Sequence, residues 1–174
     1  MVIVITGPGK GKTTSAVGQT LRALGAGLDV AFCQFLKAPE YQGRPAGEQL
    51  MLAKLLGENF HAGGLGFYFG SRQDGEEYER HRRAALDCQA WARGRLQSGA
   101  QMLVLDEALY ALGSGLLTRE ELESLLDGRG DAHVVLTGRG LPDWLLERAD
   151  LVSSVEEVKH PFAEGEQGCR GVEF

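Results

Sequence analysis

The chain has 174 residues, of which 43% are hydrophobic and 24% charged, with a net charge of −6. A chain of this length buries enough surface to fold without disulfides or a structural metal, so a single domain over residues 1–174 is expected. The acidic balance argues against a general nucleic-acid-binding protein. No apolar run reaches the roughly 20 residues of a membrane span, and no basic signal segment precedes the first run. Three cysteines without CxxC spacing predict reduced thiols and a cytoplasmic protein: Cys33, Cys88 and Cys169.

The first half of the chain alternates apolar runs with helical patterns. Residues 2–5 predict a strand buried on both faces. After a glycine-rich turn, four apolar residues recur at helical spacing, namely Val17, Leu21, Leu24 and Leu28, and Gly25 and Gly27 offer a stop for the helix. We then expect a strand at 30–36, a helix at 47–56, a glycine- and aromatic-rich loop at 63–70, and a long polar helix at 76–97.

The second half repeats this alternation. A strand at 102–105 runs into Asp106 and Glu107, and Thr118 with Glu121 forms a capping box for a helix through residue 126. A strand at 133–136, a helix from Pro142 through 148, and a long strand at 151–158 follow, with room for a short strand at 172–174. This order predicts an α/β domain with a mostly parallel sheet, helices on both faces, and ligands at the carboxyl ends of the strands.

Residues 7–14 carry the strongest functional signal. A strand, a glycine-rich turn and a helix form the layout of a phosphate-binding loop (P-loop), in which backbone N–H groups and the helix N-terminus face an anion. Lys12 is expected to contact the phosphates, and the Thr13 hydroxyl to bind Mg²⁺. The loop is one residue shorter than the common GxxxxGK, so a triphosphate needs an adjusted arrangement. The candidate residues of this phosphate-binding loop are Gly7, Gly9, Lys10, Gly11, Lys12, Thr13 and Thr14.

Two further segments are candidates for the same site. Asp106 and Glu107 follow an apolar strand. Carboxylates at the end of such a strand are the usual magnesium partner of a P-loop. In an NTP hydrolase such a Glu often polarises water, whereas in a transferase the carboxylates can hold the metal instead. Arg139 lies in a TGRG turn after another strand, and the sequence leaves it open between a phosphate ligand and a surface residue.

The loop at 63–70 contains three consecutive aromatic residues, Phe67, Tyr68 and Phe69. They are too many to be all core in such a loop, so at least one is expected to contact a flat apolar ligand, with a collapsed loop as the alternative. The run at 81–83 (HRR) is expected to be a solvated face of the long helix.

Taken together, these segments resemble those of the P-loop ATP:cob(I)alamin (corrinoid) adenosyltransferases. The resemblance extends over nearly the whole chain in ordered blocks, which are GKGKTT at 9–14, LRALG at 21–25, QFLK at 34–37, GE at 47–48, GF at 66–67, VLDE at 104–107, HVVLTGRG at 133–140, ADLV at 149–152, VKHPF at 158–162 and GVEF at 171–174.

The resemblance implies that reduced cobalt, Co(I), attacks C5′ of ATP and that triphosphate leaves. The family is understood to bind ATP in reversed orientation, which leaves C5′ open. No protein nucleophile is required, so catalysis reduces to positioning and to neutralising the leaving group. By this analogy Lys10, Lys12 and Arg139 neutralise phosphate, and Thr13 and Glu107 hold Mg²⁺. A homodimer and a flavoprotein reductase are the implied partners.

The resemblance also gives the aromatic loop a role. Family aromatics there displace the lower ligand of Co(II), and the four-coordinate cobalt is then easier to reduce, a role that falls to Phe67 and Phe69. This sequence differs in having Phe69 where Trp is common and Pro8 where Asn is frequent. It also begins at the first expected strand, without the arm that many members fold over the site, so a partner chain or reductase is expected to complete the pocket.

Two other classes of function remain open from the residues alone. One is a P-loop nucleoside or metabolite kinase or an ATPase, which would release ADP rather than triphosphate. The other is a non-catalytic nucleotide- or corrinoid-binding protein, which would bind ATP without turnover.

Overall fold

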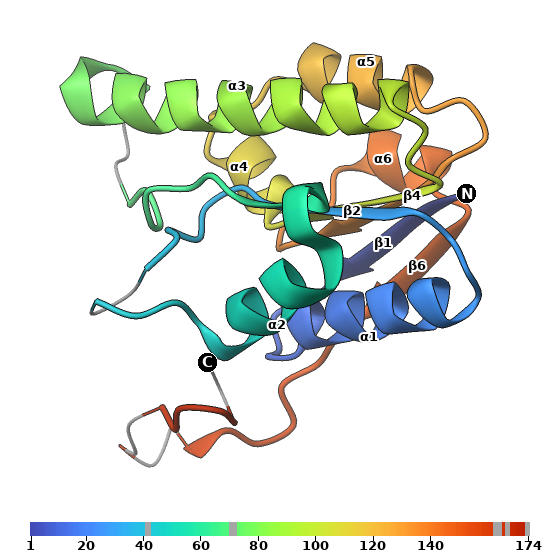
Figure 1. Ribbon diagram of the computed structural model, residues 1–174. Helices are drawn as coiled ribbons and strands as arrows, with labels where there is room; N and C mark the ends of the chain where they lie inside the picture. Colours follow the sequence, from blue (N-terminus) through green and yellow to red (C-terminus); the bar gives the residue numbers. More distant parts are fainter. Residues whose placement is uncertain (41–42, 70–72, 162–164, 166–167, 173–174) are drawn as a thin grey trace.

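The strands form one parallel sheet in the order β3-β2-β4-β5-β1-β6. The computed structural model describes residues 1–174 except 41–42, 70–72, 162–164, 166–167 and 173–174 (Figure 1). The five strand pairings of this sheet are all parallel, as the apolar runs between helices predict. The strands are β1 (Val2–Thr6), β2 (Val30–Gln34), β3 (Phe60–Ala62), β4 (Met102–Asp106), β5 (His133–Thr137) and β6 (Leu151–Ser154).

Helices cover both faces of the sheet, which confirms the predicted α/β class. In Figure 1, α1 and α2 lie on one face, and α3 to α6 lie on the other. A short 3₁₀ turn, η1 (Gly57–Asn59), follows α2. The helices are α1 (Lys12–Gly25), α2 (Gly47–Leu56), α3 (Gly75–Gln97), α4 (Ala108–Gly113), α5 (Arg119–Asp127) and α6 (Asp143–Arg148). Within the described ranges, no helix combines the length and apolar character needed to cross a membrane.

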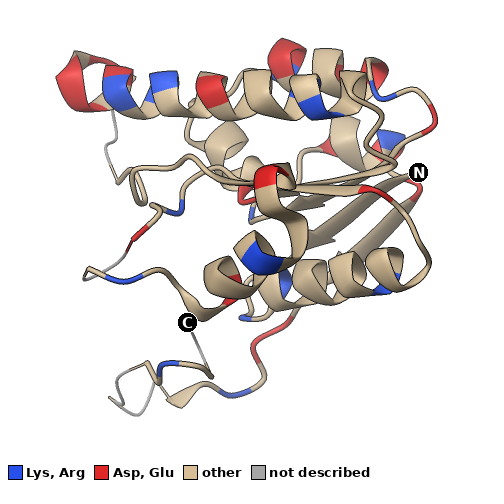
Figure 2. Ribbon diagram, in the orientation of Figure 1, with Lys and Arg blue, Asp and Glu red and all other residues tan. Residues whose placement is uncertain are grey.

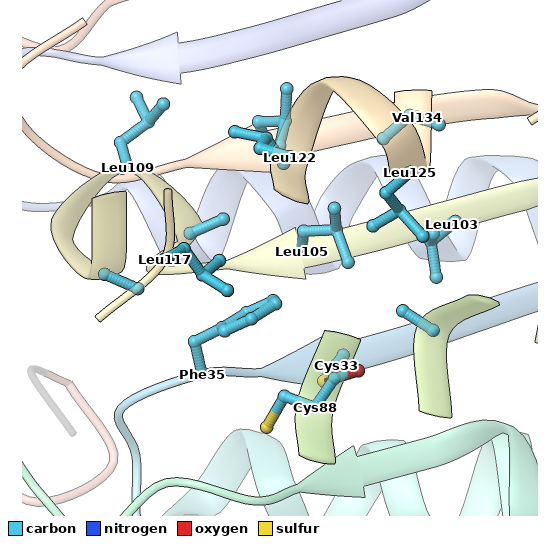
Figure 3. Close-up of a cluster of buried hydrophobic side chains, with 14 of the residues drawn as sticks. Cys33, Phe35, Cys88, Leu103, Leu105, Leu109, Leu117, Leu122, Leu125 and Val134 are labelled. Atoms are coloured by element: carbon cyan, nitrogen blue, oxygen red, sulfur yellow. Dashed lines mark hydrogen bonds between the residues drawn. The ribbon is translucent and has the colours of Figure 1, made fainter. Parts of the chain in front are cut away.

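Each face of the sheet has its own core. Figure 3 shows the larger cluster, in which Leu103 and Leu105 of β4 meet α3 and α5 through Cys88 and Leu125. The other face packs α1 and α2 against the sheet, with Phe32 completely buried. Truncating a fully buried leucine such as Leu103 or Leu105 to alanine typically costs about 2–5 kcal/mol of folding free energy. The three cysteines are all free.

Several boundaries differ from those expected. The strands predicted at 30–36 and 151–158 end at Gln34 and Ser154, because their partners end there: Gln34 pairs with the last residue of β4, and Ser154 with the last of β1. Strand β3 and helix α4 are additional elements. The strand expected at 172–174 lies mostly outside the described residues, and Val172 itself is in a turn.

Two predicted helix faces also need correction. Of the four apolar positions expected there, Val17, Leu24 and Leu28 pack against the core, whereas Leu21 is 50% exposed. Apart from Lys12, the fully buried residues of α1 are small, which lets the helix lie close to the sheet; they are Ala16, Thr20 and Ala23. On α3, the Arg82 side chain is only 20% exposed. Its guanidinium donates to both carboxylate oxygens of Glu121 on α5, at 2.6 and 2.8 Å.

The remaining helix predictions agree better with the structure. The capping box of α5 is formed, with the Glu121 N–H donating to the Thr118 hydroxyl at 3.2 Å. Figure 2 shows acidic and basic residues interspersed along the ribbon of α3.

Candidate functional site

The candidate site lies at the carboxyl ends of the parallel strands, as expected for this fold. The P-loop (residues 7–14) follows β1, Lys37 follows β2, and Arg139 follows β5. Strand β4 ends in Asp106, with Glu107 next to it. All of these segments therefore emerge at the carboxyl ends of neighbouring strands, and this brings together residues that lie far apart in the sequence.

Glycines of the P-loop allow a close approach to the segment after β6. A Cβ on Gly7 or on Gly9 would overlap the backbone of residues 155–156. The Gly9 N–H donates to the Val155 carbonyl at 2.8 Å, so it is already paired, and its predicted role as a phosphate donor stays a prediction. Gly11 precedes α1 with a φ of 118°, a left-handed conformation that favours glycine.

Lys12 is folded back into the loop. Its ammonium donates to the carbonyls of Gly7 and Gly9, at 3.0 and 2.6 Å, and the residue is 7% exposed. Burial lowers the pKa of Lys12, and the nearby Arg139 lowers it further, against the opposing effect of Glu107. The anionic phosphate of a nucleotide would be a better partner for this cation than the two neutral carbonyls.

Asp106 is completely buried and is held by three side chains. It accepts hydrogen bonds from the hydroxyls of Thr137 at 2.7 Å and Thr13 at 3.0 Å, and from the amide of Gln34 at 3.0 Å. Burying a carboxylate in this way is tolerated because its oxygens are paired. Asp106 therefore fixes the position of the Thr13 hydroxyl.

Glu107 has the only left-handed conformation among the described non-glycine residues, with a φ of 61°. It precedes α4, and its N–H donates to the Thr137 hydroxyl at 2.9 Å. This backbone turns the side chain into the cleft beside the P-loop. Burial raises the pKa of Glu107, and Asp106 raises it further, while Lys37 has the opposite effect.

Lys37 and Glu48 are functional candidates that we did not predict individually. Their ion pair is 2.9 Å long, and the Lys37 ammonium also lies 3.1 Å from the Thr13 hydroxyl. Burial lowers the pKa of Lys37, but Asp106 and Glu48 outweigh it and hold the pKa above its usual value. The position of Lys37 just past β2 could have indicated a site residue, because ligands bind at the carboxyl ends of the strands. The contact with Glu48 could not be predicted, because it depends on how α2 folds back.

These side chains surround a cleft of about 260 Å³. Six predicted site residues line it, together with Val17, Lys37 and Glu48; the six are Lys10, Gly11, Lys12, Thr13, Thr14 and Glu107. Arg139 is outside that lining, and its guanidinium donates to the Pro8 carbonyl of the P-loop at 2.7 Å. Lys10 donates to the Val172 carbonyl at 2.9 Å, so the C-terminal segment reaches the cleft.

The aromatic loop (residues 63–69) divides its three rings between core and solvent. Tyr68 is 5% exposed, whereas Phe67 and Phe69 are 46% and 85% exposed. The Phe67 ring packs edge-on against Tyr110, at 5.2 Å between centroids. The three rings are therefore not all core, as predicted. Residue 70, the last of the loop expected from the sequence, lies outside the described residues.

The start of the aromatic loop is docked on Leu36, two residues past the end of β2. The Gly66 N–H donates to the Leu36 carbonyl at 2.7 Å, and a Cβ on Gly64 would overlap that same carbonyl group. Because Leu36 immediately precedes Lys37, the aromatic loop and the cleft share a support.

Comparison with known proteins gives one consistent answer. The chain matches the family described as ATP:corrinoid adenosyltransferase BtuR/CobO/CobP over residues 1–174. It is 35% identical to corrinoid adenosyltransferase CobA of Salmonella typhimurium, over 100% of this chain and 85% of that protein. It is 34% identical to the corrinoid adenosyltransferase of a Sinorhizobium species and 35% identical to that of Escherichia coli K12, again over 100% of this chain and over 80% and 85% of theirs. The chain therefore belongs to the ATP:corrinoid adenosyltransferase family.

Proposed function

We propose that the cleft beside the P-loop is where this adenosyltransferase binds ATP for transfer of the 5′-deoxyadenosyl group to the Co(I) of a corrinoid. The observation that carries the assignment is the set of three ammonium groups on one small cleft, those of Lys10, Lys12 and Lys37. The cleft also lies at the N-terminus of α1, a helix of 14 residues, whose dipole favours an anion. A polyanion such as triphosphate is the ligand that this arrangement suits.

None of the residues at the cleft has to act as a nucleophile. The nucleophile is the cobalt of the corrinoid substrate, which forms a bond to C5′ as the bond to the triphosphate oxygen breaks. The protein must hold ATP in place and neutralise the charge that develops on the leaving triphosphate. We assign the phosphate contacts to Lys10 and Lys12 within the cleft, with Arg139 supporting the P-loop from the Pro8 side.

The oxygen atoms near Thr13 fit a magnesium ion. The Thr13 hydroxyl donates its proton to Asp106, which leaves its lone pairs for a cation, and the Lys37 ammonium stands at 3.1 Å from that oxygen. Oxygen donors of this kind are those that Mg²⁺ prefers. We propose that Thr13 and Glu107 hold the ion with the ATP phosphates. When bound, Mg²⁺ would offset triphosphate charge.

We assign corrinoid contact to the exposed rings of the aromatic loop, Phe67 and Phe69. A corrin ring is a wide, mostly apolar surface, and two exposed phenyl rings on one loop are a suitable counterpart. Their centroids are 6.1 Å apart, so both can contact one ligand face.

The test is anaerobic incubation with ATP, Mg²⁺ and chemically reduced corrinoid, followed by absorbance for the Co–C bond and by chromatography for the phosphate product. Adenosyl transfer releases one triphosphate per Co–C bond. Release of ADP would favour a kinase or ATPase, and ATP binding with no product would favour a non-catalytic protein. The homodimer, the flavoprotein reductase and the cytoplasmic location stay predictions from the resemblance and the sequence.

A further inference from the structure

Lys37 occupies the centre of an oxygen cage. Its ammonium lies 2.9 Å from Glu48 Oε1, 3.1 Å from Thr13 Oγ1 and 3.4 Å from Asp106 Oδ2. The three oxygen-bearing residues come from α2, α1 and β4, so the cage forms only when these elements are packed together. The Lys37 and Glu48 side chains are 24% and 20% exposed, and that of Asp106 is completely buried.

The same oxygens that surround this ammonium include the one that we assign to magnesium. Mg²⁺ binds oxygen at about 2.0–2.1 Å. A magnesium ion on Thr13 would therefore lie within a few ångströms of the Lys37 ammonium, where like charges repel strongly because the surroundings are partly buried. The metal and the ammonium cannot both occupy the centre of the cage.

We propose that Lys37 is a resident cation that keeps this cage closed to free divalent metal and gives it up when the metal arrives together with the nucleotide. The inference rests on the proposed ATP site. Lys37 lines the cleft assigned to the triphosphate, and its flexible four-carbon stem lets the ammonium move from the cage to a phosphate. The triphosphate supplies the anionic partner that the displaced ammonium requires, whereas free Mg²⁺ supplies none.

The cage also has a structural role before ligands bind. With the ammonium removed, Glu48 would face the buried Asp106 without an intervening cation. Breaking an ion pair by removing one partner leaves the other charge uncompensated, which destabilises the fold. A metal ion entering the emptied cage would compensate the same charges, so a variant without the ammonium should gain stability from a divalent cation.

The experiment measures binding of Mn²⁺, a paramagnetic substitute for Mg²⁺, by electron paramagnetic resonance without any nucleotide. The wild type should bind Mn²⁺ weakly. Lys37→Met, which keeps the unbranched stem but removes the charged ammonium, should bind it at least ~10-fold more tightly. It should also melt at a lower temperature than the wild type without metal and regain stability with Mn²⁺. Lys37→Arg keeps the charge and should leave the cage closed.

Two further variants make the test specific to the cage. Lys54→Met removes a positive charge from an exposed position of the same helix as Glu48, and it should bind Mn²⁺ like the wild type. In the double variant Lys37→Met/Glu48→Gln, the gained affinity should fall back, because one carboxylate is lost. If Lys37→Met folds only with Mn²⁺ present, that rescue supports the proposal, and failure to fold under both conditions counts against it.

Equal Mn²⁺ affinity of wild type and Lys37→Met without nucleotide would overturn the inference, as would a gain of the same size in Lys54→Met. These measurements do not depend on catalysis. If the wild type transfers the adenosyl group but Lys37→Met gains no Mn²⁺ affinity, only the inference about Lys37 fails. If no transfer is detected while the Mn²⁺ results hold, the proposed function fails and the closed metal cage remains.

Discussion

The Thr13 hydroxyl donates a hydrogen bond to the Asp106 carboxylate at 3.0 Å, across 93 residues of sequence. The bond joins the start of α1, which lines the cleft, to the buried end of β4. Asp106 is anchored in turn by Thr137 and Gln34. The hydroxyl assigned to magnesium is thus oriented by the fold before any ligand binds, which lowers the entropic cost of assembling the site.

Lys12→Ala should reduce adenosyl transfer by at least about 100-fold, equivalent to about 2.7 kcal/mol of transition-state stabilisation. A charge-assisted contact to the leaving triphosphate is worth this much in a site that excludes water. The measurement is kcat/KM from preformed Co(I), with Lys54→Ala on the exposed side of α2 as the matched control. Near-normal turnover in Lys12→Ala would remove the phosphate role from this lysine.

Glu107→Gln should make the ligand-free protein more stable at neutral pH. The pKa of Glu107 is raised by burial and then by Asp106, so the folded state binds more protons than the unfolded state between the two pKa values. Stability therefore falls as pH rises through that window, and the amide removes the loss. The melting temperature of the variant should exceed that of the wild type at pH 7. The difference should disappear below the unfolded carboxyl pKa of about 4.3.

The same substitution should impair function, because one metal-binding charge is gone. Transfer activity should fall, and a higher Mg²⁺ concentration should be needed for half-maximal rate. A magnesium titration that matches the wild type would place Glu107 outside the metal site, and equal melting temperatures at pH 7 would contradict the pKa argument.

The parts of the site that could be predicted from the sequence are those carried by local patterns. The apolar runs of β1 and β4, followed by the P-loop and by Asp106, are short-range signals, and parallel strands bring their carboxyl ends to one edge. The Lys37–Glu48 pair could not be found in this way, because it depends on the path of the chain between β2 and α2. The pairing of the Gly9 N–H with Val155 likewise depends on β6 returning beside β1.

The elements that escaped prediction are short or exposed. Strand β3 has three half-buried residues, and α4 has six residues that begin after a left-handed Glu107, so both are too short to show a repeating apolar pattern. Strand β6 is exposed at all four positions and lies at the edge of the sheet, which is why its apolar residues did not mark its end. Leu21 is exposed on α1 because the smaller residues of that helix face the sheet.

Gly64→Ala should destabilise the protein by about 1–3 kcal/mol, because its Cβ would overlap the Leu36 carbonyl and force the aromatic loop away from the segment that follows β2. Gly94→Ala is the matched control. Gly94 lies within α3 with open space around its Cα, so alanine there should stabilise by about 0.5–1 kcal/mol. Urea unfolding measures both. A Gly64→Ala protein as stable as the wild type would contradict the docking of the loop on Leu36.

Phe69 offers a test that separates cobalt reduction from adenosyl transfer. If its ring expels the lower ligand of Co(II), Phe69→Ala should be slow when the assay starts from Co(II) with a mild reductant. It should be nearly normal with preformed Co(I), because the phosphate and metal contacts are intact. Phe69→Trp should be neutral or faster from Co(II), because a larger ring fills more of the space that the ligand would occupy.

The exposure of Phe69 sharpens this test. A side chain that is 85% exposed contributes little to packing, so Phe69→Ala should melt within about 1 °C of the wild type. Tyr68→Ala is the contrasting control: Tyr68 is buried in the core, and its loss should lower the melting temperature and slow both assays together. Equal rate losses from Co(II) and from Co(I) in Phe69→Ala would remove the ligand-expelling role from this residue, since a ring that acts only on Co(II) cannot affect a reaction that starts from Co(I).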